Sequence, residues 1–176
     1  MGNETAIIIP IVEVEPIVGQ LRLQHDKAAQ LGVPTHITLL YPFCGLKAVT
    51  GEIENLKHLC ASIEAFPFSF TEVRRFPASV YLHPDKAERF AQITMTLVKK
   101  WPDCKPYNGA FSDIVPHLTV AAQVDTGTLA AVEDTLRHRL PIKCVAREVW
   151  LLTSDHTGMW SKKAAFAMGG ARNSCP

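Results

Sequence analysis

Most of the short motifs that commonly reveal a function are missing from this sequence of 176 residues. It contains no G-x-S-x-G turn for a nucleophilic serine, no P-loop for phosphates and no H-E-x-x-H pair for zinc. Its five cysteines are an odd number and form no C-x-x-C pair, which argues against a disulfide framework and against a zinc ribbon. We therefore expect reduced thiols, no metal and no other cofactor.

An excess of charge is missing as well, because 18 basic residues are balanced by 17 acidic ones. Such a chain has no strong field to attract a long polyanion, so a small ligand or a nucleic-acid end fits better than a long duplex. The apolar run from Ala6 to Val14 is short, contains Pro10 and follows no basic segment, so it predicts a strand rather than a signal peptide. No membrane contact is expected, and we predict a cytoplasmic monomer.

Signals for a folded domain are abundant, since 47% of the residues are hydrophobic and 20% are charged, as in ordinary globular proteins. Alternating or β-branched apolar runs predict strands, and apolar residues at steps of three and four predict helices. The predicted strands cover residues 6–14, 35–43, 67–77, 79–84, 115–124, 142–153 and 159–168. The predicted helices cover residues 16–32, 47–65, 85–101 and 129–140. Asp85 and Glu88 fit a capping box at the start of the third helix.

This order of elements favours an α+β fold with antiparallel sheets flanked by helices. Residues 35–83 and 116–168 repeat one order, which is a strand with a histidine, then a helix, then a pair of strands. The period is far longer than that of a solenoid repeat, so it indicates two related lobes rather than an array. We therefore predict a single two-lobed domain over residues 1–176, pseudo-duplicated, with a central cleft.

The first strand of each repeat has the same polar pattern, in the stretches "THITLLYPF" and "PHLTVAA". Because strand side chains alternate between faces, His36 and Thr38 share one face, and His117 and Thr119 do the same. Either histidine alone would be an ordinary strand residue bonded to the backbone, but the repetition favours a shared site. Two imidazoles can act as general acid and base, and threonine hydroxyls can bind phosphoryl oxygens, which are the roles we predict for these residues.

Four aromatic residues are candidates for contact with a substrate, because aromatic rings stack on bases. Phe43 follows the first motif, Tyr107 and Phe111 precede the second, and Tyr81 lies in the strand over residues 79–84. Packing in the core or in a lid is the competing role of each ring. Simple alternation assigns Tyr41 to the core.

Four basic residues occupy corresponding strand pairs of the two repeats: Arg74, Arg75, Lys162 and Lys163. They could meet phosphates at the rim of a cleft, but an ordinary solvated strand edge is the favoured interpretation.

The pair "HITL" and "HLTV", on corresponding strands of a duplicated α+β chain, resembles the signature of the two-histidine (2H) phosphoesterase superfamily. That superfamily includes RNA 2',3'-cyclic phosphodiesterases, 2'-5' RNA ligase-like proteins and the AMP-binding domain of kinase-anchoring proteins. The resemblance covers nearly the whole chain. It implies a metal-independent hydrolase in which His36 and His117 exchange protons while Thr38 and Thr119 hold the phosphate.

The substrate implied by the resemblance is a nucleoside or RNA-terminal 2',3'-cyclic phosphate. A non-catalytic module for an AMP-like nucleotide and a 2'-5' RNA ligase would use the same residues and remain alternatives. The second motif continues with Ala121 and Ala122, where many RNA-acting members carry a basic residue, and this departure makes long RNA a less suitable substrate.

Overall fold

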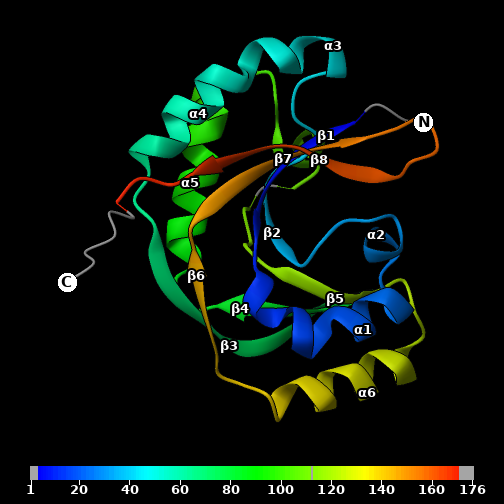
Figure 1. Ribbon diagram of the computed structural model, residues 1–176. Helices are drawn as coiled ribbons and strands as arrows, with labels where there is room; N and C mark the ends of the chain where they lie inside the picture. The colour runs from blue at the N-terminus through cyan, green and yellow to red at the C-terminus, as the bar shows by residue number, and fades with distance from the viewer. Residues whose placement is uncertain (1–3, 112, 171–176) are drawn as a thin grey trace.

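Two four-stranded antiparallel sheets form the frame of the computed structural model, which describes residues 4–111 and 113–170 (Figure 1). The first sheet has the strand order β2-β1-β7-β8, and the second has the order β5-β4-β3-β6. The strands of the first sheet are β1 (Thr5–Pro10), β2 (His36–Leu40), β7 (Glu148–Ser154) and β8 (Trp160–Ala167). Those of the second are β3 (Phe66–Phe76), β4 (Ser79–Pro84), β5 (Leu118–Ala122) and β6 (Ile142–Ala146). The predicted α+β class with two antiparallel sheets is confirmed.

Helices cover one face of each sheet. Two of them, α4 and α5, pack against β8 and β2 of the first sheet, and α1 and α6 pack against β5 and its neighbours in the second (Figure 1). The long helices are α1 (Glu15–His25), α4 (Ile53–Ser62), α5 (Ala87–Lys100) and α6 (Thr126–Arg137). The short ones are α2 (Lys27–Gln30), α3 (Leu46–Val49), η1 (Val12–Val14), η2 (Thr50–Glu52) and η3 (Pro106–Gly109).

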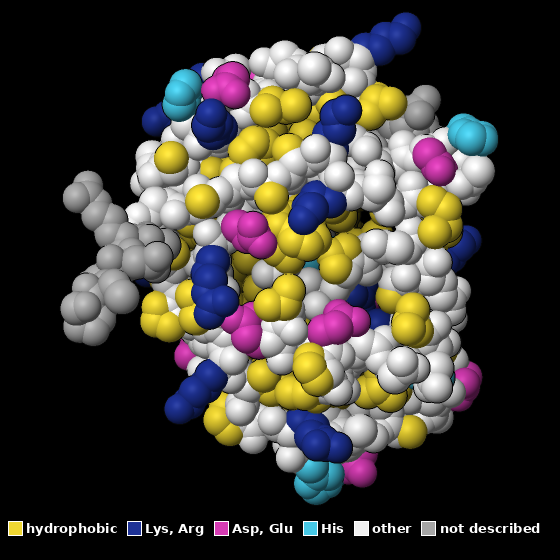
Figure 2. All heavy atoms as spheres, in the orientation of Figure 1, with side chains coloured by type: hydrophobic (Ala, Val, Ile, Leu, Met, Phe, Trp, Pro, Cys, Tyr) yellow, Lys and Arg dark blue, Asp and Glu magenta, His cyan; other side chains and the backbone are white. Residues whose placement is uncertain are grey.

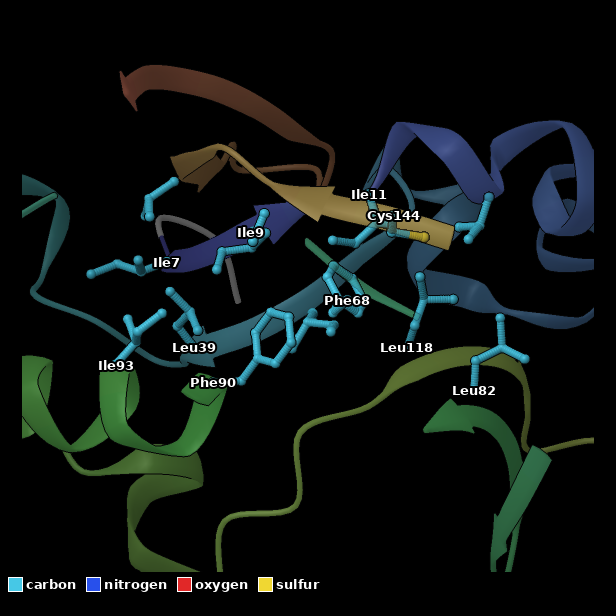
Figure 3. Close-up of a cluster of buried hydrophobic side chains, with 14 of the residues drawn as sticks. Ile7, Ile9, Ile11, Leu39, Phe68, Leu82, Phe90, Ile93, Leu118 and Cys144 are labelled. Atoms are coloured by element: carbon cyan, nitrogen blue, oxygen red, sulfur yellow. The ribbon is translucent and has the colours of Figure 1, made fainter. Parts of the chain in front are cut away.

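One hydrophobic core lies between these helices and both sheets. Its members include Ile7 and Ile9 of β1, Leu39 of β2, and Phe90 and Ile93 of α5 (Figure 3). Burying one such side chain contributes about 1.5–3 kcal/mol relative to leaving it exposed. Because this one cluster takes residues from both sheets, we propose that the two lobes form a single domain.

The two sheets do not coincide with the two sequence repeats. The β3–β4 pair of the first repeat lies beside β5, and the β7–β8 pair of the second repeat lies beside β1 and β2. The predicted strand over residues 142–153 is in fact two strands, β6 in the second sheet and β7 in the first, with a break at Arg147. The buried positions change from 142, 144 and 146 to 149 and 151 across the adjacent polar residues Arg147 and Glu148. This change of phase marks the point where the chain passes from one sheet to the other.

Two helix predictions also need correction. The helix predicted over residues 16–32 is divided at Asp26, whose side chain accepts a hydrogen bond from Ala28 N at 3.0 Å and caps α2. The helix predicted from Asp85 begins at Ala87 without a side-chain cap. Asp85 instead accepts a hydrogen bond from Ser69 N at 2.9 Å, so its carboxylate serves β3 rather than the helix.

A bulge interrupts both motif strands directly after the threonine. The pairing of β2 with β1 skips Leu39, and the pairing of β5 with β4 skips Val120. The extra residue lets two successive side chains enter the core, because Leu40 is buried beside Leu39. Tyr41 therefore lies on the opposite face, which corrects the core position expected from simple alternation.

Candidate functional site

The candidate site lies where the two sheets meet. Strands β2 and β5 are each the outermost strand of their sheet, and these two edges contact one another. The core side of each sheet is covered by helices, and we call the opposite side, which carries the motif histidine and threonine, the site face. His36 and His117 are close enough that the charge of His117 contributes to lowering the pKa of His36. The fold thus brings together the two histidines that the sequence singled out.

The ring of His36 is held at both nitrogens. Its Nδ1 lies 2.7 Å from the carbonyl oxygen of Pro34, and its Nε2 lies 3.0 Å from Oγ1 of Thr38. A carbonyl can only accept, so Nδ1 carries the proton and donates. In the neutral ring, Nε2 must then accept a hydrogen bond from the Thr38 hydroxyl. The basic nitrogen of His36 is therefore engaged by the neighbouring threonine.

The ring of His117 is anchored in the same way but is open at the other nitrogen. Its Nδ1 donates to the carbonyl oxygen of Val115 at 2.7 Å, again two residues earlier in the chain. Within the described part of the chain, no hydrogen bond involves its Nε2. The imidazole ring lies edge-on to the ring of Phe76, with the two centroids 5.1 Å apart. Its centroid lies 5.2 Å from that of the Tyr81 ring.

Both histidines are less basic than a free imidazole. Burial is the main cause that lowers the pKa of His36 to about 3, and the positive charges of Arg22 and His117 act in the same direction. Arg22 lies on α1, is 2% exposed, and forms an ion pair of 2.8 Å with Asp26. Burial also lowers the pKa of His117. At neutral pH we therefore expect both rings of the free protein to be uncharged.

Tyr107 and Phe111 lie beside the first motif. The phenol of Tyr107 forms a hydrogen bond with the side chain of Thr38, and its backbone N–H donates to the carbonyl of Tyr41. Phe111 is 68% exposed and lies edge-on to Tyr107 at 5.5 Å. These two predicted rings therefore extend from Thr38 toward solvent.

Of the other two predicted aromatic residues, one lies at the site and one does not. Tyr81 pairs directly with Thr119 across β4 and β5 and stacks on Phe76 at 4.4 Å. Phe43 is buried in the core, edge-on to Trp101 at 5.1 Å, and its N–H donates to the carbonyl of Thr5, the first residue of β1. We therefore infer that Phe43 packs in the core and does not contact substrate.

The strand pairing also places Arg74, for which an ordinary solvated strand edge was the favoured interpretation, on the site face. Across the second sheet, Thr119 pairs with Tyr81, and Tyr81 pairs with Arg74. Arg74 is bound by Glu72 at 2.8 Å, whereas its neighbour Arg75 bonds to Glu133 of α6 and so lies on the helix-covered side. Adjacent residues of a strand project from opposite faces, so Arg74 and Arg75 could have been assigned to different faces once the pairing of β3 with β4 was known.

The first sheet has a corresponding row. Thr38 pairs with Ile8, and Ile8 pairs with Trp150. The Nζ atom of Lys162 lies 4.0 Å from the centre of a Trp150 ring, while Lys163 lines a pocket with Ser161 and Thr153 on the helix-covered side. Each motif threonine thus begins a row of side chains that leads across its sheet toward a basic residue.

Charges of both signs are interspersed on the face of the molecule seen in Figure 2, with hydrophobic side chains gathered between them. Among residues 4–111 and 113–170, no three His, Cys, Asp or Glu side chains come together as a metal site would require. No helix in those ranges is both long enough and apolar enough to span a membrane.

Comparisons with known proteins bear on the family and the fold of the chain. The sequence matches the model of the 2'-5' RNA ligase superfamily over residues 10–158. No curated protein sequence matches the chain. Similar solved structures include LigT of E. coli complexed with 3'-AMP, which is 15% identical, with 97% of this chain and 100% of that chain covered and a TM-score of 0.61.

Two further structures have the same fold. LigT of E. coli complexed with NADP+ is 14% identical, with 96% of this chain and 99% of that chain covered and a TM-score of 0.61. The Thermus thermophilus protein TT0787 is 14% identical, with the same coverage of 96% and 99% and a TM-score of 0.63. At this level of identity the likeness establishes the fold.

Proposed function

Because the chain belongs to the 2'-5' RNA ligase superfamily, whose model matches residues 10–158, we propose that it is a metal-independent phosphodiesterase for 2',3'-cyclic phosphates. The observation that carries this proposal is that His36, the first residue of edge strand β2, lies near His117, which directly precedes the contacting edge strand β5. Each ring donates its Nδ1 proton to a carbonyl two residues earlier, so each offers Nε2 for proton transfer.

In the proposed reaction a cyclic phosphate lies between Thr38 and Thr119, whose hydroxyls donate to its non-bridging oxygens. The Nε2 of one histidine removes a proton from water as the water oxygen bonds to phosphorus. The bond from phosphorus to one ribose oxygen breaks, and the other histidine, which must enter the reaction as the imidazolium, protonates that oxygen from Nε2 and becomes neutral, leaving a phosphate monoester. The similar placement of the two histidines lets the orientation of the substrate decide which one is the base.

Thr38 couples binding to activation of its histidine. In the free protein its hydroxyl donates to Nε2 of His36 and so occupies the lone pair that a general base needs. A bound phosphate is a stronger acceptor than a neutral imidazole, so the hydroxyl should turn to the phosphate and release Nε2. His117 needs no such release, because its Nε2 has no hydrogen bond within the described residues.

The test is a substrate panel assayed without added metal and with a chelator. It contains 2',3'-cyclic mononucleotides, oligonucleotides that end in a cyclic phosphate, and ADP-ribose 1'',2''-cyclic phosphate. Turnover of at least one of them should persist with the chelator present. Activity that disappears with the chelator and returns with zinc or magnesium would contradict the metal-free scheme.

A non-catalytic module for an AMP-like nucleotide is the second candidate, and the hydrogen bond from Thr38 to His36 Nε2 favours it because it occupies the proposed base. Calorimetry distinguishes the two functions. Binding of 5'-AMP without turnover of any substrate in the panel would support the binding module. Joining of RNA ends faster than cleavage would instead support the ligase.

A further inference from the structure

Lys162 and Trp150 lie on the site face of the first sheet, in the row that begins at Thr38. Directly paired residues of antiparallel strands project from the same face, so Thr38, Ile8 and Trp150 share one face. Two strand spacings separate Thr38 from Trp150, which is about 10 Å. Lys162 pairs with Leu152, which is buried in the same small apolar cluster as Ile8. Both residues are therefore beside the candidate site without touching the motif.

The ammonium group of Lys162 is available for a ligand. Its Nζ lies 4.0 Å above the Trp150 ring, and the side chain is exposed. Among the described residues, no carboxylate lies within ion-pair distance of it. Arg74, at the end of the corresponding row in the second sheet, is already bound by Glu72. The two rows thus differ in that only the cation on the first sheet lacks an acidic partner within the described chain.

The indole of Trp150 adds a second donor. Its Nε1 is buried and has no hydrogen-bond partner among the described residues. A buried N–H without a partner costs about 1–3 kcal/mol, so such a group in a folded protein calls for an explanation. Movement of the flexible Lys162 side chain would let a ligand oxygen reach the indole. Accepting a hydrogen bond from Nε1, that oxygen would remove the cost of the unpaired N–H. An ammonium group beside an indole N–H suits an anionic oxygen group such as a phosphate.

We propose that Lys162 and Trp150 bind a second phosphate of the substrate, while Thr38 and Thr119 hold the cyclic one. This inference rests on the proposed function for the position of the first phosphate. It narrows the substrate class to cyclic phosphates that carry another phosphate, either the neighbouring phosphodiester of an RNA end or the diphosphate of an ADP-ribose derivative. A cyclic mononucleoside phosphate would leave the subsite unused.

The test compares kcat/KM for three substrates. One is 2',3'-cyclic AMP, one is the dinucleotide ApA ending in a 2',3'-cyclic phosphate, and one is ADP-ribose 1'',2''-cyclic phosphate. Lys162→Met, which keeps an aliphatic stem over Trp150, should lower kcat/KM about tenfold for a substrate with a second phosphate and leave 2',3'-cyclic AMP unchanged. If only the dinucleotide loses kcat/KM, the second phosphate is the phosphodiester of an RNA end. If only ADP-ribose 1'',2''-cyclic phosphate does, it is the diphosphate.

Lys163→Met is the matched control, because Lys163 is the adjacent residue but lines the pocket on the helix-covered side. It should leave all three values unchanged. Trp150→Phe keeps an aromatic ring but removes the indole N–H together with the five-membered part of the indole, so it should also lower kcat/KM selectively for the substrates with a second phosphate. The proposed subsite would be overturned if Lys162→Met lowered kcat/KM equally for all three substrates, or did not lower it for any of them.

A binding measurement separates this inference from the proposed function. If the wild-type protein cleaved none of the substrates, the hydrolase proposal would fail but the subsite could still be tested by calorimetry. Adenosine 2',5'-bisphosphate should bind the wild type more tightly than adenosine 2'-monophosphate, and Lys162→Met should remove that advantage. Equal affinity of the wild type for both ligands would contradict the subsite.

Discussion

The two motif strands have the same backbone design and different surroundings. His36 begins β2 and His117 directly precedes β5; each histidine donates its Nδ1 proton to the carbonyl two residues earlier, and in each strand a bulge follows the threonine. His36 is nevertheless engaged by Thr38 and lies near the charge of buried Arg22, whereas His117 lies against Phe76 and Tyr81. The shared backbone sets where each Nε2 lies, and the different neighbours set how readily it takes a proton.

The strongest test of this comparison is to remove each histidine in turn. His36→Ala and His117→Ala should each lower kcat/KM by at least about 10²-fold, because each removes one proton-transfer partner. The double variant should be little worse than either single one, since the two rings act as a unit. His58→Ala, at an exposed position on α4, is the control and should retain full activity. Substantial activity in one folded motif variant would show that the two strands are not equivalent partners.

The second test removes the charge that distinguishes the surroundings of His36. Arg22 and Asp26 form a buried ion pair with side chains 3% and 6% exposed. Arg22→Met should destabilise the fold by about 3–5 kcal/mol, because it leaves a buried carboxylate without its partner. Arg22→Met combined with Asp26→Leu should recover most of that loss in chemical denaturation. If the double variant were as unstable as the single one, unpaired charge would not be the cause.

The third test measures activity as a function of pH, and the lowered pKa values of the two histidines decide on which side of neutrality activity should be highest. Lower pKa values for both rings move both limbs of the kcat/KM profile of the free enzyme to lower pH. The base is then already unprotonated well below pH 6.5, and the acid loses its proton before neutrality. Activity should therefore peak on the acidic side of the free-imidazole pKa of about 6.5 and fall as pH rises through neutrality. A profile centred above that value would contradict the burial of the two rings.

The smallest expected effect separates the two tyrosines at the site. Tyr107→Phe removes a hydrogen bond to Thr38 and should destabilise the protein by about 0.5–1.5 kcal/mol. Tyr81 pairs with Thr119 in the sheet, but its ring is held by stacking on Phe76, so Tyr81→Phe should change stability less. Thermal melting of both variants measures the difference. The reverse ranking would show that the phenol of Tyr81 has an important partner.

The sequence predicted those features that depend on local patterns. Alternation identified the motif strands, apolar spacing identified the long helices, and the α+β class followed from their order. Simple alternation failed at the bulge of β2, which moved Tyr41 to the site face. It also treated residues 142–153 as one strand, although the buried positions change phase at Arg147 and Glu148, where the chain changes sheets. The low pKa of His36 depends on burial and on Arg22, which is distant from the motif along the chain and near it only after folding.

The exchange of strand pairs between the sheets has a consequence for how the molecule forms. The first sheet is completed by β7 and β8 from the end of the chain, so its inner strand β1 pairs locally with β2 but must wait for its second partner, β7, more than a hundred residues away. Pairings so distant in sequence slow folding, and strands left without neighbours invite aggregation. A nascent chain released before residue 154 would lack one side of that sheet. We accordingly expect neither half to be expressible as a stable separate protein, and expect unfolding to occur in one cooperative step.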